Sequence, residues 1–176
     1  MTSEILCGKG ANLQVDAIVA VYSDWGIGAN GTQPVAIPAD RRNFAELTKG
    51  AAVIVGRKTL ADLPEGLPLK GRFNVVMTAS NITVKGAAVA GTVSDALEMV
   101  KNHEKVFVIG GESIYRSFFA HINRIFVTKL EICPHSDVFF ENLDASPDWH
   151  CVQRGPGEEY EGIKYGFYIY ERIGAG

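Results

Sequence analysis

Short apolar runs alternate with amphipathic segments along most of this chain. The apolar runs have the length of buried strands, and the segments between them have helical spacing. Strands are predicted at 17–22, 52–55, 74–77, 106–109 and 124–130, and helices at 38–49, 57–62, 94–103 and 112–119. This repeated order of strand, crossover helix and strand is typical of an α/β domain with a mostly parallel sheet.

The C-terminal part of the chain follows a different pattern. Strand-like segments at 149–154 and 164–170 are separated by GPGEEYEG, which is rich in turn-forming residues and predicts an antiparallel hairpin at a sheet edge. Residues 1–14 have no periodic pattern and are expected to form an N-terminal extension or an additional edge strand. We therefore expect one domain at 15–173, with a short tail at 174–176.

Composition narrows the classes of protein that the chain can represent. Its 176 residues are 47% hydrophobic and 21% charged, as in an ordinary globular domain. The net charge is −3 and no basic run is longer than Arg41–Arg42, which argues against nucleic acid or a membrane surface as partner. The three cysteines are widely spaced and lack metal-ligand spacing, so reduced thiols, no metal and a cytoplasmic location are expected.

The segment VFVIGGESIY, residues 106–115, is the most informative motif. An apolar strand pattern runs directly into Gly110 and Gly111 and then into a helix start. Glycines permit close approach of a ligand to the main chain, and the amides at the start of the helix suit a pyrophosphate. A nucleotide cofactor is one interpretation of this motif, and a simple tight turn is the other.

A second motif, WGIGANGTQPVAIPADRRNF at 25–44, is a glycine-rich loop that leads into a helix. Asp40 shares a face of that helix with Phe44 and Leu47. The carboxylate is either a solvated group favoured by the helix dipole or part of a binding site. Among apolar neighbours, a carboxylate needs hydrogen-bond donors, and a ligand with an amidine-like pair of N–H groups would supply two.

Two further segments place cations beside predicted strands. In VIVGRKTL, residues 53–60, Arg57, Lys58 and Thr59 follow a strand and could contact phosphates, or they could form a solvated basic turn. In KGRFNVVMT, residues 70–78, Arg72 precedes a strand and could hold a carboxylate with two hydrogen bonds, or it could simply be exposed.

Taken together, these segments resemble dihydrofolate reductase. The matching pieces, in chain order, are AIVAVYSDWGIGANG, PVAIPADRRNF, VIVGRKT, LKGRFNVVMT, VFVIGGESIY, FVTKL and SDVFF, and they cover nearly all of the chain from Ala17 onward. The resemblance implies a three-layer α/β fold with a mostly parallel eight-stranded sheet, an antiparallel C-terminal edge hairpin and four flanking helices. It also implies NADPH-dependent reduction of 7,8-dihydrofolate to 5,6,7,8-tetrahydrofolate by a monomer that antifolate inhibitors can bind.

The resemblance assigns roles to individual residues. The implied catalytic residues are Asp40, which would bind the 2-amino group and N3 of the pterin, Thr128, which would support Asp40, and Tyr115, near the nicotinamide. The implied substrate-binding residues are Ile18, Val19, Val35, Asp40, Phe44, Arg72, Ile109 and Thr128. The implied cofactor-binding residues are Ala20, Ile27, Gly28, Gly56, Arg57, Lys58, Thr59, Thr78, Ala79, Ser80, Ile109, Gly110, Gly111, Glu112, Ser113, Ile114 and Tyr115. Residues 25–33 would form a mobile loop over the nicotinamide.

The implied reaction transfers a hydride to C6 of the pterin while N5 receives a proton from solvent, with Asp40 acting electrostatically. The chain departs from the family pattern at several positions, one of which is Val138 in place of a more usual threonine. Val35 replaces a common tryptophan, Arg41 replaces an apolar residue and is expected either to turn outward or to add a cation for the glutamate tail, and Ala79 replaces a common basic ligand of the 2′-phosphate. A reductase of a ribosylamino-pyrimidine and a non-catalytic ligand-binding relative are the alternative functions.

Overall fold

The computed structural model describes residues 12–33 and 35–174 and contains one large mixed sheet. The greater part of the expected extension, residues 1–11, lies outside the described residues, as do Pro34 and residues 175–176 of the expected tail. Residues 12–14 have no regular secondary structure. They lead directly into the first strand.

Nine strands make up the large sheet. Eight of them follow the order β10-β11-β7-β1-β6-β3-β4-β5, and β9 pairs with the edge of β11. The strands are β1 Val15–Val21, β3 Ala52–Gly56, β4 Phe73–Met77, β5 Ala88–Ala90, β6 Val106–Gly110, β7 Arg124–Leu130, β9 Trp149–Arg154, β10 Glu158–Tyr160 and β11 Ile163–Arg172. The pairs from β7 to β5 are parallel, whereas β9, β10 and β7 are all antiparallel to β11.

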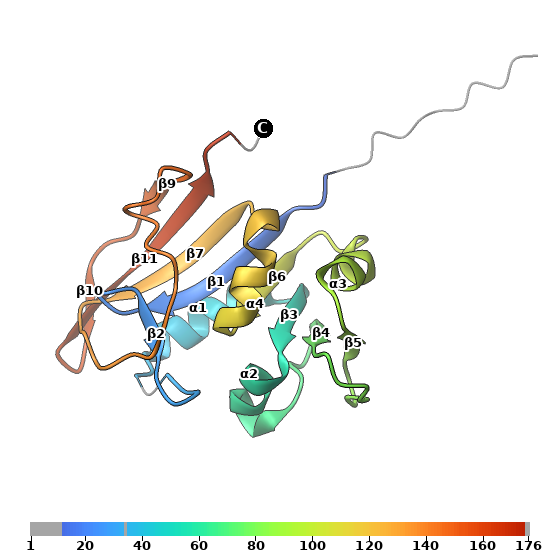
Figure 1. Ribbon diagram of the computed structural model, residues 1–176. Helices are drawn as coiled ribbons and strands as arrows, with labels where there is room; N and C mark the ends of the chain where they lie inside the picture. The colour runs from blue at the N-terminus through green and yellow to red at the C-terminus, as the bar shows by residue number, and fades with distance from the viewer. Residues whose placement is uncertain (1–11, 34, 175–176) are drawn as a thin grey trace, which may run out of the picture.

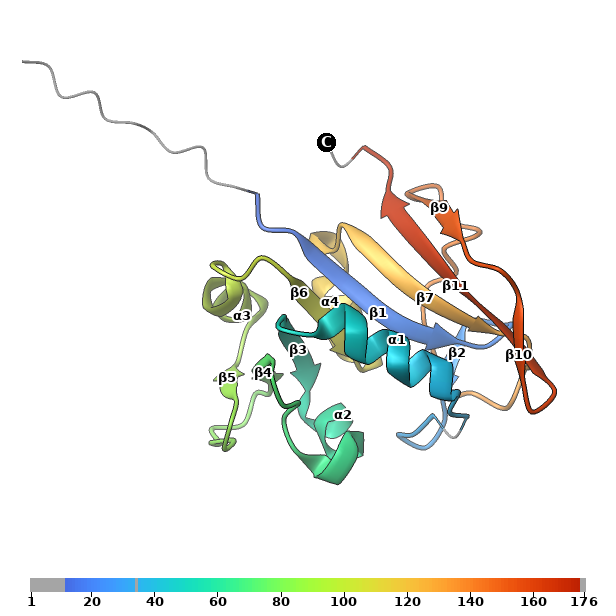
Figure 2. The same ribbon diagram turned by 180° about the vertical axis from the view of Figure 1, so that it is seen from behind.

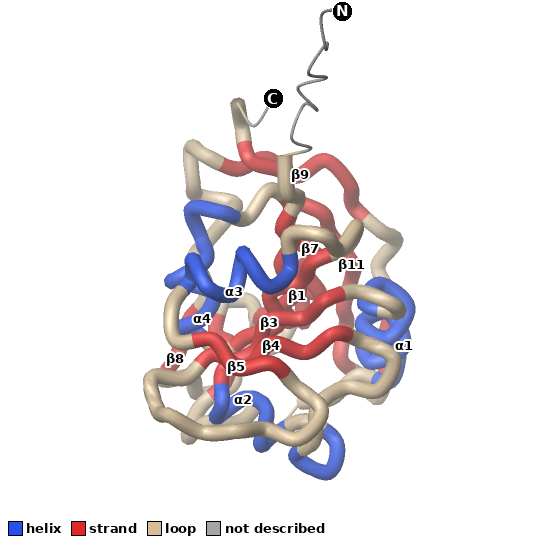
Figure 3. Tube along the Cα trace, turned by 90° about the vertical axis from the view of Figure 1, so that its right-hand side faces the viewer, coloured by secondary structure: helices blue, strands red, loops and turns tan. Residues whose placement is uncertain are grey.

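Helices cover both faces of the sheet and create three layers. Figure 1 shows α3, Val93–Val100, and α4, Glu112–Phe118, in front of the sheet, and Figure 2 shows α1, Pro38–Thr48, on the opposite face. The side view in Figure 3 separates these layers, with α2, Arg57–Asp62, beyond the end of β3. Two 3-10 turns, Pro64–Gly66 and Phe119–His121, complete the helical segments.

The alternation of side chains along β1 explains how the two apolar layers form. Val15, Ala17 and Val19 belong to the core cluster that includes residues of α3 and α4, whereas Ile18 belongs to the cluster that packs against Phe44 of α1. Successive side chains of a strand point to opposite faces, so one apolar run can supply both layers. This explains why the sequence of β1 is apolar at every position except Asp16, which pairs with Arg124, rather than alternating.

These observations confirm the expected fold class. The predicted strands and helices are present within a few residues of their expected bounds, and Gly50 ends α1 with a φ of 71°, a conformation that glycine adopts easily. The sheet has one strand more than the implied eight, because residues 158–160 of the connection GPGEEYEG form β10 and pair with 163–165. The expected antiparallel pairing between β9 and β11 is also present.

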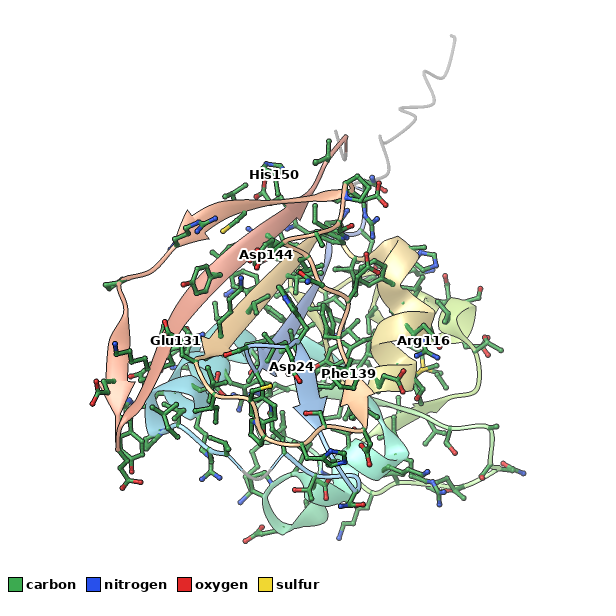
Figure 4. The ribbon with its side chains drawn as sticks, turned by 60° about the vertical axis from the view of Figure 1, so that its left-hand side comes forward. Asp24, Arg116, Glu131, Phe139, Asp144 and His150 are labelled. Atoms are coloured by element: carbon green, nitrogen blue, oxygen red, sulfur yellow. The ribbon has the colours of Figure 1, made fainter. Side chains whose placement is uncertain are left out.

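A separate two-stranded ribbon holds the glycine-rich segment. Strand β2, Gly26–Gly28, pairs antiparallel with β8, Val138–Phe139. Figure 4 shows Phe139 of this ribbon close to Asp24, the residue that precedes Trp25. Within the described part of the chain, no helix is long and apolar enough to cross a membrane.

Candidate active site

The centre of the sheet opens at its carboxyl edge. Strand β1 pairs with β6 only at residues 15–17, whereas its pairing with β7 continues to Val21. Strand β6 instead continues beside β3 as far as Gly110. The carboxyl-terminal halves of β1 and β6 therefore separate, and crevices of this kind bind ligands in open α/β sheets.

Asp40 lies in the first turn of α1 and is half-buried. Its Oδ1 accepts a hydrogen bond of 2.6 Å from Oγ1 of Thr128, a buried residue of β7. Burial raises the pKa of Asp40 above its ordinary value, while the Thr128 hydrogen bond and the charge of Arg41 act in the opposite direction. The structure thus brings together two of the expected catalytic residues, with room for further donors to the carboxylate.

Arg72 is fixed at the other end of α1. Its guanidinium donates to Oγ1 of Thr48 from Nε and Nη2, to the Ala45 carbonyl from Nη2 and to the Lys70 carbonyl from Nη1, at 2.7–3.2 Å. Thr48 in turn donates to the carbonyl of Phe44 at 2.8 Å. A guanidinium has five N–H donors, so a contact with both oxygens of a carboxylate would replace at least one of these hydrogen bonds.

One face of α1 therefore carries three different groups in a row. Asp40, Phe44 and Thr48 are four residues apart and share a face, and Thr48 holds the Arg72 guanidinium. At 1.5 Å per residue the row is about 12 Å long. It presents a carboxylate, an aromatic ring and a cation in that order.

The expected apolar substrate contacts divide between the two faces of the sheet. Ile18 and Ile109 belong to the cluster that packs against Phe44, so these three residues are brought together. Val19 points to the opposite layer, in the cluster that contains Tyr115. Val35 is half-buried and packs in a third cluster with Tyr22 and Ile37.

Most of the expected cofactor residues lie along the carboxyl edge of three adjacent strands, whereas Ala20 lies on β1 and Ile27 and Gly28 lie on β2. Gly110 ends β6, Gly56 ends β3, and Thr78 follows β4. Neighbouring strands are about 4.8 Å apart, so these ends form a row of about 10 Å. A cis peptide joins Gly110 to Gly111, and a Cβ built on Gly111 would lie 2.9 Å from Oγ1 of Thr59. Only glycine leaves this space open.

The side chains around that row are mostly polar or basic. Arg57 and Lys58 at the start of α2 are exposed, and so are Ala79, Ser80 and Ser113. Oγ1 of Thr78 accepts a hydrogen bond from the amide of Ser80 at 3.1 Å. Glu112 is half-buried and pairs with Arg116, whereas Ile114 packs beside Gly56. Arg57 and Lys58 are therefore the cations available to a phosphate here.

Tyr115 spans the opening between β6 and β1. Its hydroxyl donates to the carbonyl of Ile18 at 2.7 Å, and its ring packs edge-on against Phe140 with centroids 5.1 Å apart. Burial raises the pKa of Tyr115, and the charge of Asp40 raises it further. The phenol therefore remains protonated and acts as a hydrogen-bond donor at neutral pH.

The loop at 25–33 is attached to the same opening. The carbonyl of Gly28 accepts from the amide of Asp137 at 3.0 Å, and Oδ2 of Asp137 accepts from the amide of Asn30 at 2.9 Å. Ile27 packs against the main core cluster. At the end of the loop, Nε2 of Gln33 donates to the carbonyl of Ala20 at 2.9 Å.

The sequence that forms this site also matches a known protein family. A family model described as dihydrofolate reductase matches residues 14–172. The chain belongs to the dihydrofolate reductase family. It is 34% identical to the dihydrofolate reductase of Staphylococcus haemolyticus over 164 residues, which cover 92% of this chain and 97% of the relative. It is also 34% identical to the bifunctional dihydrofolate reductase-thymidylate synthase of Glycine max, of which it spans only 34% of the length.

A solved structure supports the same conclusion. Dihydrofolate reductase from Enterococcus faecalis, complexed with NADP(H) and RAB-propyl, superposes with a TM-score of 0.79 at 26% identity, covering 91% of this chain and 96% of that one. Two side chains make contacts at the site that the sequence analysis did not assign to them, Thr48 to Arg72 and Gln33 to Ala20. The role of Thr48 could have been found from its spacing with Asp40 and Phe44. The contact between Gln33 and Ala20 left no signal in the sequence.

Proposed function

We propose that the chain catalyses the NADPH-dependent reduction of 7,8-dihydrofolate to 5,6,7,8-tetrahydrofolate. The observation that carries this proposal is the row along α1. Asp40 suits the paired N–H groups of the pterin, Phe44 suits the stacked or edge contact of an aromatic ring, and Arg72 suits the α-carboxylate of the glutamate. Dihydrofolate carries these three groups in the same order.

Asp40 would hold the pterin and act through its charge. Its carboxylate is half-buried and keeps one hydrogen bond from Thr128, so the remaining lone pairs are available to the 2-amino group and N3. An anion held in a partly desolvated site favours a protonated pterin, because its field is less screened than in water. N5 of the pterin would then receive its proton from solvent.

The residues at the carboxyl edge fit a phosphorylated dinucleotide. Exposed Arg57 and Lys58 can meet phosphate charges, Thr59 can add a hydroxyl, and Gly111 leaves space that a Cβ would close. When bound, NADPH supplies the hydride for C6 of the pterin. Tyr115, Ile18 and the loop at 25–33 would border its nicotinamide and exclude bulk water.

Several finer features belong to the same proposal. The row along α1 is expected to accept antifolate inhibitors that carry an amidine-like pair of N–H groups. Cys133 and Cys151 are free thiols, which is consistent with a reducing compartment such as the cytoplasm. The reaction would support one-carbon and thymidylate metabolism, and the chain is proposed to act as a monomer.

The test is a measurement of NADPH absorbance with and without dihydrofolate. The native chain should oxidise NADPH only when dihydrofolate is present. A parallel preparation of Asp40→Asn, shown to be folded by circular dichroism, should lose most of that activity. Binding of NADPH and dihydrofolate without oxidation would instead favour the non-catalytic alternative.

A further inference from the structure

The first turn of α4 carries a carboxylate beside the proposed position of the cofactor phosphates. Glu112 directly follows Gly111, and a Cβ on Gly111 would lie 2.9 Å from Oγ1 of Thr59, in the space that is left open for the cofactor. Arg57 and Lys58 at the start of α2 are the cations proposed to meet the phosphates. Glu112 is the one acidic member of the expected cofactor-binding residues, and it lies where the ligand would bring negative charge.

A second close approach shows that α4 begins near those cations. A Cβ on Gly56 would lie 2.9 Å from Cγ1 of Ile114, two residues beyond Glu112. Gly56 ends β3 and directly precedes Arg57. A pyrophosphate bound between the starts of α2 and α4 would therefore lie near both Arg57 and Glu112. Arg57 would attract it, and an unpaired Glu112 would repel it.

The direction of side chains on a helix determines how closely the Glu112 carboxylate approaches that position. The Cα–Cβ bonds of an α-helix are tilted towards its N-terminus, so a side chain in the first turn covers the residues that precede it. For Glu112 these residues are Gly110 and Gly111. An unpaired Glu112 carboxylate would thus lie over the glycines that the pyrophosphate is proposed to contact.

Arg116 changes this arrangement by pairing with Glu112. Its Nη2 forms a salt bridge with Oε1 of Glu112, and it lies one turn further along α4 (Figure 4). The salt bridge therefore directs the carboxylate along the helix, away from Gly111. The Arg116 side chain is 77% exposed, and exposed pairs of this kind contribute little to stability. The effect on an anionic ligand is of another kind, because the pair is neutral with Arg116 and carries one negative charge without it.

We infer that Arg116 is a positioning residue for the cofactor, which acts by neutralising Glu112 and holding its carboxylate away from the pyrophosphate. The inference rests on the proposed function, because it requires a ligand whose pyrophosphate lies at Gly111. The pair acts on ligands that carry a pyrophosphate and leaves unchanged those that lack one. Cofactor affinity therefore depends on a residue that does not itself contact the cofactor.

The direct test compares three ligands in Arg116→Gln. This variant removes the cation, so the affinity for NADP⁺ should fall about three- to tenfold at low ionic strength. The affinity for 2′-phospho-ADP-ribose should fall by the same factor, because it carries the same pyrophosphate. The affinity for adenosine 2′-monophosphate, which has no pyrophosphate, should stay within about twofold of the native value. Calorimetric titration measures all three affinities without turnover.

Two variants control for the loss of a cation from the surface. Arg116→Lys retains the charge and should keep NADP⁺ affinity within about twofold of the native value. Lys101→Gln breaks the exposed salt bridge with Glu98 at the end of α3. This pair precedes β6 in the chain and so lies towards the opposite edge of the sheet from Gly110. Lys101→Gln should leave all three affinities as in the native chain.

Glu112→Gln provides the background that separates the two possible actions of Arg116. No carboxylate then remains to be neutralised, so adding Arg116→Gln should change NADP⁺ affinity by less than about twofold. An equal loss in both backgrounds would mean that Arg116 contacts a phosphate itself and would overturn the inference. The difference between native and Arg116→Gln chains should also shrink at about 1 M salt, where charges are screened beyond about 3 Å. A difference that persists undiminished at that salt would overturn the inference as well.

The native chain distinguishes failure of this inference from failure of the proposed function. A native chain that binds neither NADP⁺ nor 2′-phospho-ADP-ribose would overturn the proposed function itself. A native chain that binds both ligands, with Arg116→Gln binding them equally well, would overturn the role of Arg116 alone. A loss in Arg116→Gln that is just as large for adenosine 2′-monophosphate would also overturn that role.

Discussion

Thr128 donates a hydrogen bond of 2.6 Å from Oγ1 to Oδ1 of Asp40, although the two residues are 88 positions apart in the chain. The contact joins the first turn of α1 to the buried centre of β7. The hydrogen bond lowers the pKa of Asp40, whereas burial raises it. Thr128 therefore helps to keep a partly desolvated carboxylate ionised, which the proposed electrostatic role of Asp40 requires.

Asp40→Asn should lower the activity of the chain and raise its stability at neutral pH. The raised pKa means that the folded state binds the Asp40 proton more tightly than the unfolded chain, whose carboxyl has the ordinary value of 3.8. Stability therefore falls as pH rises from 3.8 through the raised value, and the ionised group is destabilising at neutral pH. The variant should gain about 0.5–2 kcal/mol in free energy of unfolding at pH 7, as is common when a functional residue is replaced.

Turnover by the same variant should fall about hundredfold or more at pH 7, because a neutral amide cannot balance a protonated pterin. Urea denaturation at pH 3 and pH 7 measures the stability difference, which should shrink at the lower pH. Near-native turnover by a folded Asp40→Asn chain would refute the role of Asp40.

Thr128→Val should raise the pKa of Asp40 further. Valine has nearly the same shape as threonine but cannot donate, so the carboxylate loses the hydrogen bond that lowers its pKa. We expect a loss of about 1–2 kcal/mol in free energy of unfolding at neutral pH. A nuclear magnetic resonance titration of the Asp40 carboxyl carbon measures the pKa. Thr128→Ser keeps the hydroxyl and is the control, and an unchanged pKa in Thr128→Val would contradict the prediction.

The strands that the sequence predicted are those of five residues or more. Strands β3 and β6 were correct to within one residue, because each ends at a glycine that marks its boundary. Strands β2, β5, β8 and β10 were missed, and each has only two or three residues. A periodic pattern cannot be recognised over so short a length, and these strands depend on a partner that is distant in sequence.

Site prediction was limited in a similar way. The spacing of Asp40 and Phe44 on α1 was visible in the sequence, since a helix has a fixed periodicity. The interactions of Arg72 with the end of α1 were not visible, because they depend on how the segment before β4 lies beside that helix. The contact between Gln33 and Ala20 depends on the path of the loop, for which periodicity gives no information.

Arg72→Lys should weaken dihydrofolate binding more than the binding of a pterin that lacks the glutamate. Lysine keeps the charge but cannot reproduce the forked donors that contact Thr48 and Ala45. We expect about a tenfold loss of affinity for dihydrofolate and less than about a twofold loss for the shorter pterin. Fluorescence titration with both ligands measures this difference. Equal losses for both ligands would show that Arg72 acts only by holding α1.

Lys129→Met should weaken the base of the loop at 25–33. The Lys129 ammonium lies 4.9 Å from the ring centroid of Trp25 and 4.8 Å from that of Tyr168, and it bonds to Oδ2 of Asp144 at 2.6 Å. Asp144, labelled in Figure 4, also accepts from the Tyr170 hydroxyl at 2.6 Å. Removing the cation should cost about 1–2 kcal/mol of stability at pH 7.

The pH dependence of that loss follows from Asp144. Burial alone would raise its pKa, but hydrogen bonds from Lys129 and Tyr170 lower it below the ordinary value of 3.8. Asp144 therefore contributes stability above pH 3.8 that disappears as pH falls through the lowered value. The difference between native and Lys129→Met chains should be largest near neutral pH and smaller in acid. Lys129→Arg retains the charge and should behave like the native chain in the same thermal denaturation series.

Cofactor preference should depend on Arg57, because Ala79 offers no cation to the 2′-phosphate. Arg57 is exposed at the end of β3, and Thr78 and Ser80 follow the neighbouring strand β4. The 2′-phosphate carries nearly two charges at neutral pH, so loss of a charge-assisted hydrogen bond should cost about ten- to a hundredfold in NADPH affinity. Arg57→Ala should therefore narrow the preference for NADPH over NADH while leaving dihydrofolate affinity nearly unchanged. Ala79→Arg should widen that preference, and titration with both cofactors measures the ratio. If Arg57→Ala weakened both cofactors equally, Arg57 would be holding the pyrophosphate that NADPH and NADH share.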